Sequence, residues 1–289
     1  MSDASKQVKA AFQGERGAFS EDAARQLLGP TVKTLAYRSF DEMFDAVSAG
    51  VADCAVAPIE NSLAGSVIRN YDLLEERELT IIGETNVRIV HNLIAPLGVG
   101  FEAVRHVYSH PVALAQCERF LRAHPNIQAE AAYDTAGSVK MIIESGRRDQ
   151  AAIAGATAAA VYGAQIIAAG VEDNPANFTR FLLLAHPERA AEMPTTNRDG
   201  ERKTTIIFRV ANQPGSLFRA LAVFALRDID LTKIESRPIE GRPWEYSFYL
   251  DLIGDQHEPR IARALAHLGE MIESIRVLGS YPKAVTSDE

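Results

Sequence analysis

The first 185 residues alternate between strand-like and helix-like patterns of hydrophobic positions. Apolar runs bounded by Gly or Pro, which are typical of buried strands, lie at residues 8–13, 32–37 and 54–57. Between them, one helix is predicted from about Ser20 to Leu28, and another follows the capping box that begins at Ser39. Because strands and helices alternate, the pattern predicts a largely parallel sheet with right-handed crossovers.

A β-rich segment at residues 79–95 separates this first set of elements from a second one. The segment is long enough to cross between two lobes. Strands are predicted at residues 104–108, 127–133, 151–154, 165–169 and 180–185, and helices at 111–122, 136–145 and 156–162. Two α/β lobes joined by β crossovers leave a cleft, and ligands of open α/β sheets bind outside the carboxyl ends of the strands.

The pattern changes after residue 186. Residues 187–202 are polar, carry no apolar period and are interpreted as a linker. Residues 203–283 then show a strand, a helix, two strands, a helix and a last strand, with unbroken alternation from Trp244 to Leu252. This β-α-β-β-α-β order predicts a ferredoxin-like domain. The chain is therefore divided into residues 7–186, a linker at 187–202, and residues 203–283.

Charge and composition exclude several classes of partner. With 30 Lys and Arg against 38 Asp and Glu, the net charge is −8, so neither nucleic acid nor an anionic membrane is expected as a partner. No run approaches the roughly 18 apolar residues of a membrane helix, and the N-terminal residues lack a secretory apolar region. A cytoplasmic protein is expected, with Cys54 and Cys117 as buried, reduced thiols.

Five loops that follow predicted strands are rich in small polar residues, and most of them open a helix. They lie at residues 14–20, 58–65, 109–111, 134–138 and 177–181. Free amides at helix N-termini, with hydroxyl groups beside them, can bind a carboxylate or a phosphate. Each loop taken alone is better explained as a helix cap. Several of them at strand carboxyl ends together predict a cleft for a small anion.

The sequence lacks the motifs of several common chemistries. It contains no dinucleotide or P-loop motif, no nucleophile elbow, no HExxH and no CxxC. His91, His106 and His110 are not spaced as metal ligands, so we expect no metal and no cofactor. His110 is interpreted as a structural residue or hydrogen-bond donor rather than a general base. Glu60, at a strand end, is either a loop-orienting residue or a buried acid.

Several of these loops resemble the signature segments of prephenate dehydratase. The matching segments are Pro58-Ile59-Glu60-Asn61-Ser62, Ser109-His110-Pro111 with Ala113-Leu114-Ala115-Gln116-Cys117, Asp134-Thr135-Ala136-Gly137-Ser138, and Thr179-Arg180-Phe181. Two later segments resemble the effector motifs of its regulatory ACT domain, namely Gly215-Ser216-Leu217 and Glu235-Ser236-Arg237-Pro238. The match spans nearly the whole chain in the family's order. Departures are Glu15 for the usual Pro, Ala18 for Thr, Val112 for Gln and Ser216 for Ala.

The resemblance implies an α/β fold with a two-lobed, periplasmic-binding-protein-like catalytic domain, an interlobe cleft and a C-terminal ferredoxin-like βαββαβ ACT domain. It implies conversion of prephenate to phenylpyruvate, with loss of water and carbon dioxide, in phenylalanine biosynthesis. The reaction needs no cofactor because aromatisation of the ring supplies much of the driving force. Because no helical segment precedes the first strand, a monofunctional enzyme is expected. Arogenate dehydratase and a non-catalytic amino-acid sensor are the alternatives.

The resemblance also implies roles for individual residues. Thr179 is the residue tied to activity, as a hydrogen-bond donor to the leaving hydroxyl group. Arg180 is either a partner for a substrate carboxylate or part of a structural ion pair. The residues expected to bind substrate are Asn61, Ser62, Ser109, Thr135, Ala136, Gly137, Ser138, Asn177 and Arg180.

The C-terminal motifs are expected to bind phenylalanine as an effector. The expected contacts are Gly215, Ser216 and Leu217 at a helix start, and Glu235, Ser236, Arg237 and Pro238 on a strand that lies near it across a subunit pair. Free amides at the helix start can receive the carboxylate of an amino acid. The ferredoxin-like domain has open sheet edges and a small core, so a homodimer or homotetramer is expected.

Overall fold

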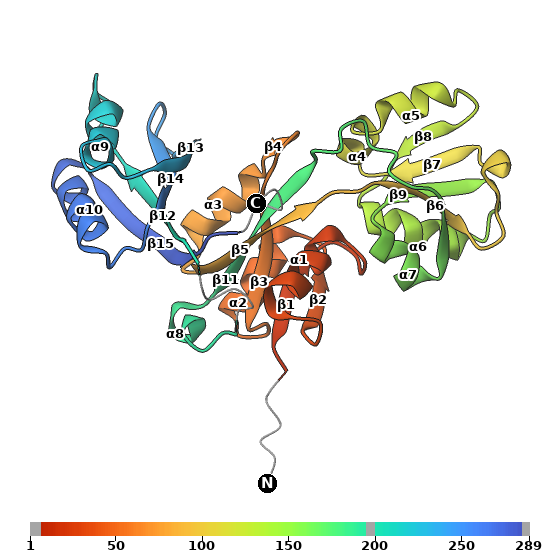
Figure 1. Ribbon diagram of the computed structural model, residues 1–289, viewed down its shortest axis with the longest axis horizontal. Helices are drawn as coiled ribbons and strands as arrows, with labels where there is room; N and C mark the ends of the chain where they lie inside the picture. Colours follow the sequence, from red (N-terminus) through yellow and green to blue (C-terminus); the bar gives the residue numbers. More distant parts are fainter. Residues whose placement is uncertain (1–6, 195–199, 285–289) are drawn as a thin grey trace, which may run out of the picture.

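The computed structural model describes residues 7–194 and 200–284. Figure 1 shows three parts in a row: a central lobe in red and orange, a second lobe in yellow and green, and a C-terminal domain in cyan and blue. After the C-terminal domain, the last described residue lies against the central lobe, where the backbone N–H of Ala284 donates to Glu84 at 2.9 Å. In this described part of the chain, no helix has the length and apolarity needed to cross a bilayer.

The sheet of the central lobe has the strand order β2-β1-β3-β11-β5, with β4 paired to β3. Its strands are β1 (Lys9–Gln13), β2 (Lys33–Tyr37), β3 (Cys54–Asn61), β4 (Gly65–Ser66), β5 (Thr80–Arg88) and β11 (Phe178–Ala185). β1 runs parallel to β2 and β3, whereas β11 runs antiparallel to β3 and β5. The expectation of a largely parallel sheet is therefore wrong. The sheet is mixed because β11 re-enters it from the second lobe.

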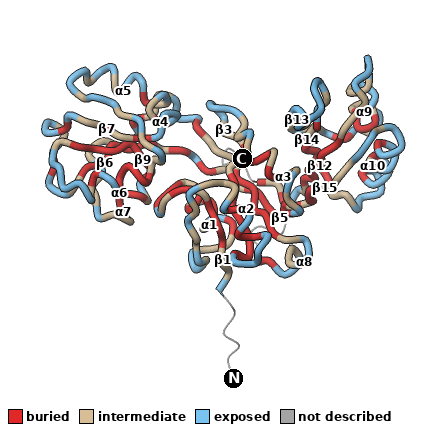
Figure 2. The backbone as a smooth tube through the Cα atoms, turned by 180° about the vertical axis from the view of Figure 1, so that it is seen from behind, coloured by how far each residue is buried: buried red, intermediate tan, exposed pale blue. Residues whose placement is uncertain are grey.

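Helices cover both faces of this sheet. Helix α1 (Phe19–Leu28) packs on one face, and α2 (Phe40–Ser48) and α3 (Ile68–Glu76) pack on the other. The strands between them form the buried centre of the lobe (Figure 2). α2 begins at the predicted cap, where Ser39 Oγ accepts the backbone N–H of Glu42 at 3.2 Å. The hydrophobic pattern does not predict α3, whose buried face mixes Tyr71 and Leu74 with the polar Asn70.

The second lobe has the strand order β10-β6-β9-β7-β8, parallel at β9-β7-β8 and antiparallel at β10-β6-β9. Its elements are β6 (Asn92–Pro96), the 3₁₀ helix η1 (Phe101–Ala103), β7 (His106–Ser109), α4 (Pro111–Ala115), α5 (Glu118–Ala123), β8 (Gln128–Ala131), α6 (Thr135–Ser145), β9 (Gln150–Ala154), α7 (Ala156–Tyr162) and β10 (Ala164–Ala168). The single helix predicted at residues 111–122 is two helices. It breaks at Gln116, whose carbonyl accepts the N–H of Asp173 at 2.7 Å.

Two segments cross between the lobes, and they are hydrogen-bonded to each other. Ile89 N donates to Asn177 O at 2.7 Å, and Val171 N donates to His91 O at 2.8 Å. The lobes also touch beside the crossovers: a Cβ atom on Gly17 would lie 2.7 Å from Ala158 Cα, so a larger residue there would push them apart. The two-lobed α/β class is confirmed.

The C-terminal domain is an antiparallel sheet in the order β13-β14-β12-β15, with two helices. Its elements are β12 (Arg202–Arg209), α9 (Ser216–Ala225), β13 (Leu231–Pro238), β14 (Tyr246–Ile253), α10 (Pro259–Met271) and β15 (Ser274–Pro282). The predicted ferredoxin-like βαββαβ unit is confirmed. The expected linker contains the short helix α8 (Pro187–Ala190), and its residues 195–199 lie outside the described residues.

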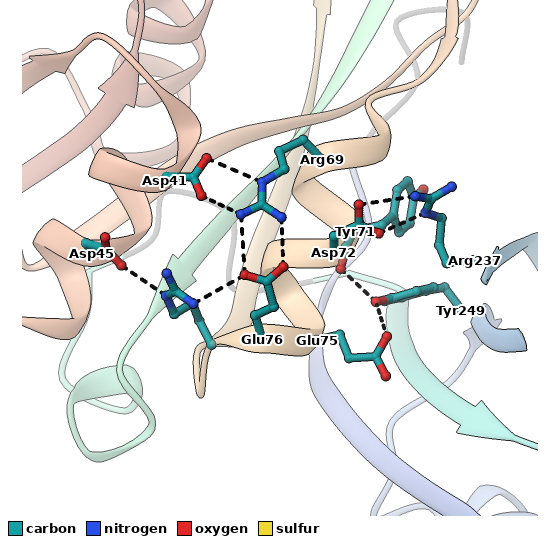
Figure 3. A network of polar contacts seen from close by, with 10 residues as sticks. Asp41, Asp45, Arg69, Tyr71, Asp72, Glu75, Glu76, Arg237 and Tyr249 are labelled. Carbon is teal, nitrogen blue, oxygen red and sulfur yellow. Dashed lines mark hydrogen bonds and ion pairs between the residues drawn. The ribbon is translucent and has the colours of Figure 1, made fainter. Parts of the chain in front are cut away.

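The C-terminal sheet packs against the central lobe with an apolar centre and charged surroundings. Ile207, Tyr249, Leu278 and Tyr281 join the core cluster formed by α2, α3 and β3. A Cβ atom on Gly279 would lie 2.1 Å from the carbonyl oxygen of Ile81, so glycine permits this contact between β15 and β5. α3 lies between α2 and the C-terminal domain and carries ion pairs to both (Figure 3).

Candidate active site

A cavity of about 500 Å³ lies between the two lobes, within the usual range for a small-molecule site. The crossover segments and the loops at the strand ends surround it. Its polar and charged lining residues are Gln13, Ser20, Asn61, Ser66, His91, His110, Gln116, Tyr133, Asp134, Thr135 and Thr179. Apolar lining residues include Phe19, Phe40, Ile89 and Phe181, which give the cavity a face suited to a carbon ring.

Asn61 fixes the orientation of the Thr179 hydroxyl group. Asn61 Oδ1 accepts the backbone N–H groups of Leu63 at 3.0 Å and Ala64 at 2.8 Å. Because a backbone N–H can only donate, the amide orientation of Asn61 is determined, and its Nδ2 is the donor toward Thr179 Oγ1 at 3.0 Å. Thr179 therefore accepts from Asn61, and its own hydrogen is available to donate into the cavity.

A chain of side-chain amides extends behind this pair. Asn61 Nδ2 also donates to Asn177 Oδ1 at 2.8 Å, and Asn177 Nδ2 donates to Gln116 Oε1 at 2.9 Å. His91 Nε2 lies 2.9 Å from the same Gln116 oxygen, so this nitrogen carries the proton. Burial lowers the pKa of His91, so the imidazole is neutral at pH 7. Its Nδ1 is buried and has no hydrogen-bond partner among the described residues.

The second lobe adds an acid to the cavity. Asp134 caps α6 by accepting the N–H of Gly137 at 2.6 Å, and Thr135 follows it at the cavity. Burial is the main cause that raises the pKa of Asp134 above its ordinary value. Within the described part of the chain, Asp134 is the one carboxyl group in the lining, which contains no Lys or Arg. The cavity thus offers neutral donors rather than fixed positive charges.

Three polar contacts hold the lobes together beside the cavity. Glu15 accepts a hydrogen bond from the Tyr133 hydroxyl group at 3.0 Å and pairs with Lys140 at 3.1 Å. On the other side, Thr157 Oγ1 donates to Asp22 at 2.9 Å. Glu15 is one of the sequence's departures from the family pattern, and here it bridges the two lobes.

The structure brings some of the expected substrate-binding residues to the cavity and leaves others outside its lining. Asn61, Thr135 and Thr179 line it, and Asn177 supports them from a buried position. Ser109 is fully buried and donates to Ile153 O at 2.6 Å, which ties β7 to β9. Ser62 donates to Ala176 O at 2.9 Å and joins two loops. Ala136, Gly137 and Ser138 are buried in the first turn of α6.

Arg180 lies on the opposite face of the sheet from the cavity. Its guanidinium pairs with Glu84 at 2.6 Å and with Asp251 of β14 at 2.6 Å, and it donates to the Tyr281 hydroxyl group at 3.1 Å. Side chains alternate along a strand, so Thr179 and Arg180 must face opposite sides of β11. Arg180 therefore has the second of its two expected roles, as part of a structural ion pair.

The first expected effector segment forms the start of α9. Gly215 caps the helix with a φ of 81°, in the left-handed region that glycine adopts without strain. Ser216 begins the helix and accepts a hydrogen bond from Arg219 at 3.2 Å, and Leu217 is partly buried against the domain core. The turn at a helix start that the sequence predicts is therefore present.

The second expected effector segment lies on β13, and two of its side chains contact the central lobe within the same chain. Glu235 accepts a hydrogen bond from Ser66 of β4, and Arg237 pairs with Asp72 of α3 at 2.8 Å (Figure 3). The remaining members, Ser236 and Pro238, are exposed. This strand therefore connects the C-terminal domain with a hairpin that lines the cavity.

The loops of the cavity are easier to predict from the sequence than its deeper residues. Gln116 and His91 are central to the amide chain, but Gln116 sits inside a predicted helix and His91 inside a β-rich run. Gln116 reaches the cavity at the break between α4 and α5, which the helical pattern of residues 111–122 does not reveal. Both cysteines are buried, and burial raises the pKa of each thiol to about 12, as expected for unreactive thiols.

Fold and site together define a two-lobed α/β protein with an interlobe polar cavity and a C-terminal ferredoxin-like domain. The prephenate dehydratase family matches residues 10–189, and the ACT domain matches residues 204–270. Arogenate dehydratase/prephenate dehydratase 2 of Arabidopsis thaliana is 45% identical over 288 residues, covering 96% of this chain and 74% of the relative.

Two solved structures are similar over nearly the whole chain. Prephenate dehydratase from Arthrobacter aurescens in complex with L-Phe has a TM-score of 0.86 at 33% identity, covering 96% of this chain and 90% of that one. GqqA, described as a novel type of quorum-quenching acylase, has a TM-score of 0.85 at 36% identity, covering 95% and 97%. This chain belongs to the prephenate dehydratase family of lyases, which act in phenylalanine biosynthesis, and it carries an ACT domain.

Proposed function

We propose that the chain converts prephenate to phenylpyruvate, carbon dioxide and water. The observation that carries the proposal is the Thr179 hydroxyl group, which accepts from Asn61 and is free to donate into the cavity. A hydroxyl group held in this way is suited to a leaving oxygen atom that gains negative charge in the transition state. The apolar part of the lining, with Phe19 and Phe181, suits the six-membered ring.

The reaction balances with one proton taken up. The bond between the ring and its carboxylate breaks, and its electron pair enters the ring. The ring hydroxyl group then departs from the opposite carbon and takes the proton to become water. Thr179 donates a hydrogen bond to the departing oxygen, or relays to it a proton that solvent supplies. Aromatisation drives both cleavages, so the residues have to orient the substrate and stabilise developing charge.

The two carboxylates of prephenate need donors that do not hold the departing one too strongly. A carboxylate becomes neutral carbon dioxide during the reaction, so a fixed cation beside it would stabilise the ground state more than the transition state. The lining supplies amides and hydroxyl groups, among them Gln116, Thr135 and Ser66. This composition supports a decarboxylating dehydration.

The direct test is an assay of carbon dioxide release from prephenate by the full chain, at neutral pH where spontaneous loss is slow. We expect one carbon dioxide per phenylpyruvate and one proton taken up, with a kcat of roughly 1–1,000 per second. Failure to turn over either prephenate or arogenate, in a protein that binds phenylalanine, would favour the sensor.

The competing substrate is arogenate, which has an ammonium group where prephenate has a keto group. Relatives such as arogenate dehydratase 2 of Petunia hybrida, 43% identical, carry that activity in their names. An ammonium group would find its counter-ion at Asp134, the carboxyl group among the described lining residues. Measuring the activity of wild type and of Asp134→Asn toward both substrates tests this contact. The variant should lose more activity toward arogenate than toward prephenate.

The similarity to GqqA brings an acylase reaction into consideration. Hydrolysis of an amide needs an activated nucleophile, and a hydroxyl group is activated by an adjacent base. Thr179 is paired with the amide of Asn61, which cannot take up a proton at neutral pH. The Thr179 site therefore supports dehydration better than acyl transfer, and an acyl-amide substrate belongs in the assay as a comparison.

We also propose that phenylalanine binds the ACT domain and changes the activity of the cleft, in a dimer or tetramer that the ACT domains help to build. The turn at Gly215 and the strand from Glu235 to Pro238 support this assignment. β13 is an edge strand of its sheet, which favours pairing with another subunit.

Calorimetric titration of phenylalanine into wild type and into the Gly215→Val, Ser236→Ala double variant tests the effector site. We expect binding in wild type and none in the variant, with a change in substrate affinity of about 5- to 150-fold. Light scattering at micromolar concentration should give a dimer or a tetramer. Unchanged phenylalanine binding in the double variant would contradict the effector site. A monomer in light scattering would contradict the proposed oligomer.

A further inference from the structure

Two neighbouring residue pairs on β3 and β11 face opposite sides of the central sheet. Thr179 is paired in register with Asn61, and Arg180 is paired with Glu60. Because side chains alternate along a strand, the first pair faces the cavity and the second faces the ACT domain. The hydrogen bond that orients the Thr179 hydroxyl group is therefore one residue away from the domain interface on both strands.

The ACT domain holds both members of the rear pair. Asp251 of β14 binds Arg180 at 2.6 Å, and Lys233 of β13 binds Glu60 at 3.0 Å. The side chains of Arg180 and Asp251 are 13% and 6% exposed, so their ion pair is largely shielded from water. Shielded ion pairs resist displacement more than exposed ones, because separating them leaves buried charges without partners.

Further contacts make the arrangement around Arg180 rigid. Glu84 pairs with Arg180 and also with Lys203 of β12 at 2.7 Å, and Asp251 accepts from Thr205 at 2.6 Å. Two cations and two carboxylates are thus balanced within one buried group. A shift of the ACT sheet must move this group as a unit, and the backbone of β11 must move with Arg180.

The same ACT strand also contacts the hairpin at the edge of the cavity. Lys233 lies two residues before Glu235, which accepts a hydrogen bond from Ser66. Ser66 lines the cavity, and β4 is paired with β3 at Glu60. β13 therefore contacts the end of β3 from the rear, through Glu60, and from the hairpin side, through Ser66.

We propose that Glu60 and Arg180 are positioning residues through which the ACT domain sets the geometry of the Asn61–Thr179 hydrogen bond. The proposal rests on the proposed function and names the structural route by which that site is regulated. Neither residue touches substrate. Glu60 aligns Asn61 from the preceding position on β3, and Arg180 aligns Thr179 from the following position on β11.

The test is Lys233→Met, which removes both contacts that Lys233 makes with the end of β3 and its hairpin. These are the ion pair with Glu60 and the hydrogen bond, at 3.3 Å, that Lys233 donates to the Ser66 hydroxyl group. Lys233 is suitable because it lies far in sequence from the catalytic strands. The matched control is Arg209→Met, which removes another interface ion pair, to Glu75 of α3, and leaves β3 and β11 untouched. Lys233→Arg restores the charge and serves as the rescue.

We expect Lys233→Met to lower kcat at least fivefold with KM within about twofold of wild type, and Lys233→Arg to recover most of the loss. Arg209→Met should leave kcat within twofold. A purely structural role for the ion pair would affect Lys233→Met and Arg209→Met alike. An unchanged kcat in Lys233→Met, or an equal loss in both variants, would overturn the proposal.

An NMR measurement, which does not depend on turnover, tests the positioning role of Glu60 independently of the proposed reaction. The side-chain amide protons of Asn61, identified by their absence in Asn61→Asp, should shift in the NMR spectrum of Lys233→Met and stay in place in Arg209→Met. If the chain acts on neither prephenate nor arogenate, the proposed function fails, and this shift still decides the positioning role. Unshifted Asn61 protons in Lys233→Met would refute it.

Discussion

The two faces of β11 differ in how they use polarity. On the cavity face, Thr179 meets the neutral amide of Asn61, and the described lining holds no Lys or Arg. On the rear face, Arg180 is surrounded by ionised groups from β5 and the ACT domain. The rear face carries balanced charges that fix two domains to each other. The front face carries neutral donors and leaves the charge to the substrate.

The difference follows from what each face must do. At a domain interface the partners move together, so opposite charges can stay paired there and be shielded from water. A site for a dicarboxylate must release product, and it must stabilise a charge that moves during the reaction. Neutral, oriented donors serve that purpose without a permanent counter-ion.

The rear face should be the more sensitive to removal of a charge. Arg180→Met leaves Glu84 and Asp251 with Lys203 as their remaining cation in this buried group. We expect the free energy of unfolding to fall by about 3–5 kcal/mol, measured by denaturant titration. Arg122→Met, which removes an exposed helical pair with Glu118, is the control and should cost less than about 0.5 kcal/mol. A similar small loss in both variants would mean that the rear group is not effectively buried.

The cavity face should respond in rate and not in stability. Thr179→Ala removes the oriented donor, so kcat should fall by at least about 100-fold, equivalent to about 2.7 kcal/mol of transition-state stabilisation. Circular dichroism and the unfolding midpoint should match wild type. Thr179→Ser keeps the hydroxyl group and should retain most of the rate. A folded Thr179→Ala protein with nearly full turnover would remove Thr179 from the mechanism.

The smallest expected effect concerns the neutral imidazole behind the cavity. Burial lowers the pKa of His91 below its ordinary value of 6.5, so the unfolded chain binds more protons than the folded one as the pH falls through that value. The stability from neutral His91 is complete above pH 6.5 and is lost at lower pH. Between pH 7.5 and pH 5.5, wild type should lose up to about 1.4 kcal/mol more than His91→Gln. Equal losses in chemical unfolding would show that His91 titrates normally.

The local elements of the fold could be predicted from the sequence because they depend on near neighbours. The alternation of apolar runs locates most strands of both lobes and all six elements of the ACT domain. The capping residue Ser39 and the helix start at Gly215 are likewise local features, and both lie where the sequence predicts them. α3 escapes prediction because the polar Asn70 belongs to its buried face.

Only part of the site could be predicted from the sequence. The loops of small polar residues indicate a cleft for an anion, and strand alternation alone requires Thr179 and Arg180 to face opposite sides of β11. Which of the two faces the cleft depends on where the second lobe and the ACT domain pack. Asn61 and Thr179 are 118 positions apart, and Arg180 and Asp251 are 71 apart. No local pattern encodes such pairs, because they form when distant segments pack and the cost of burying a charge selects the partner that satisfies it.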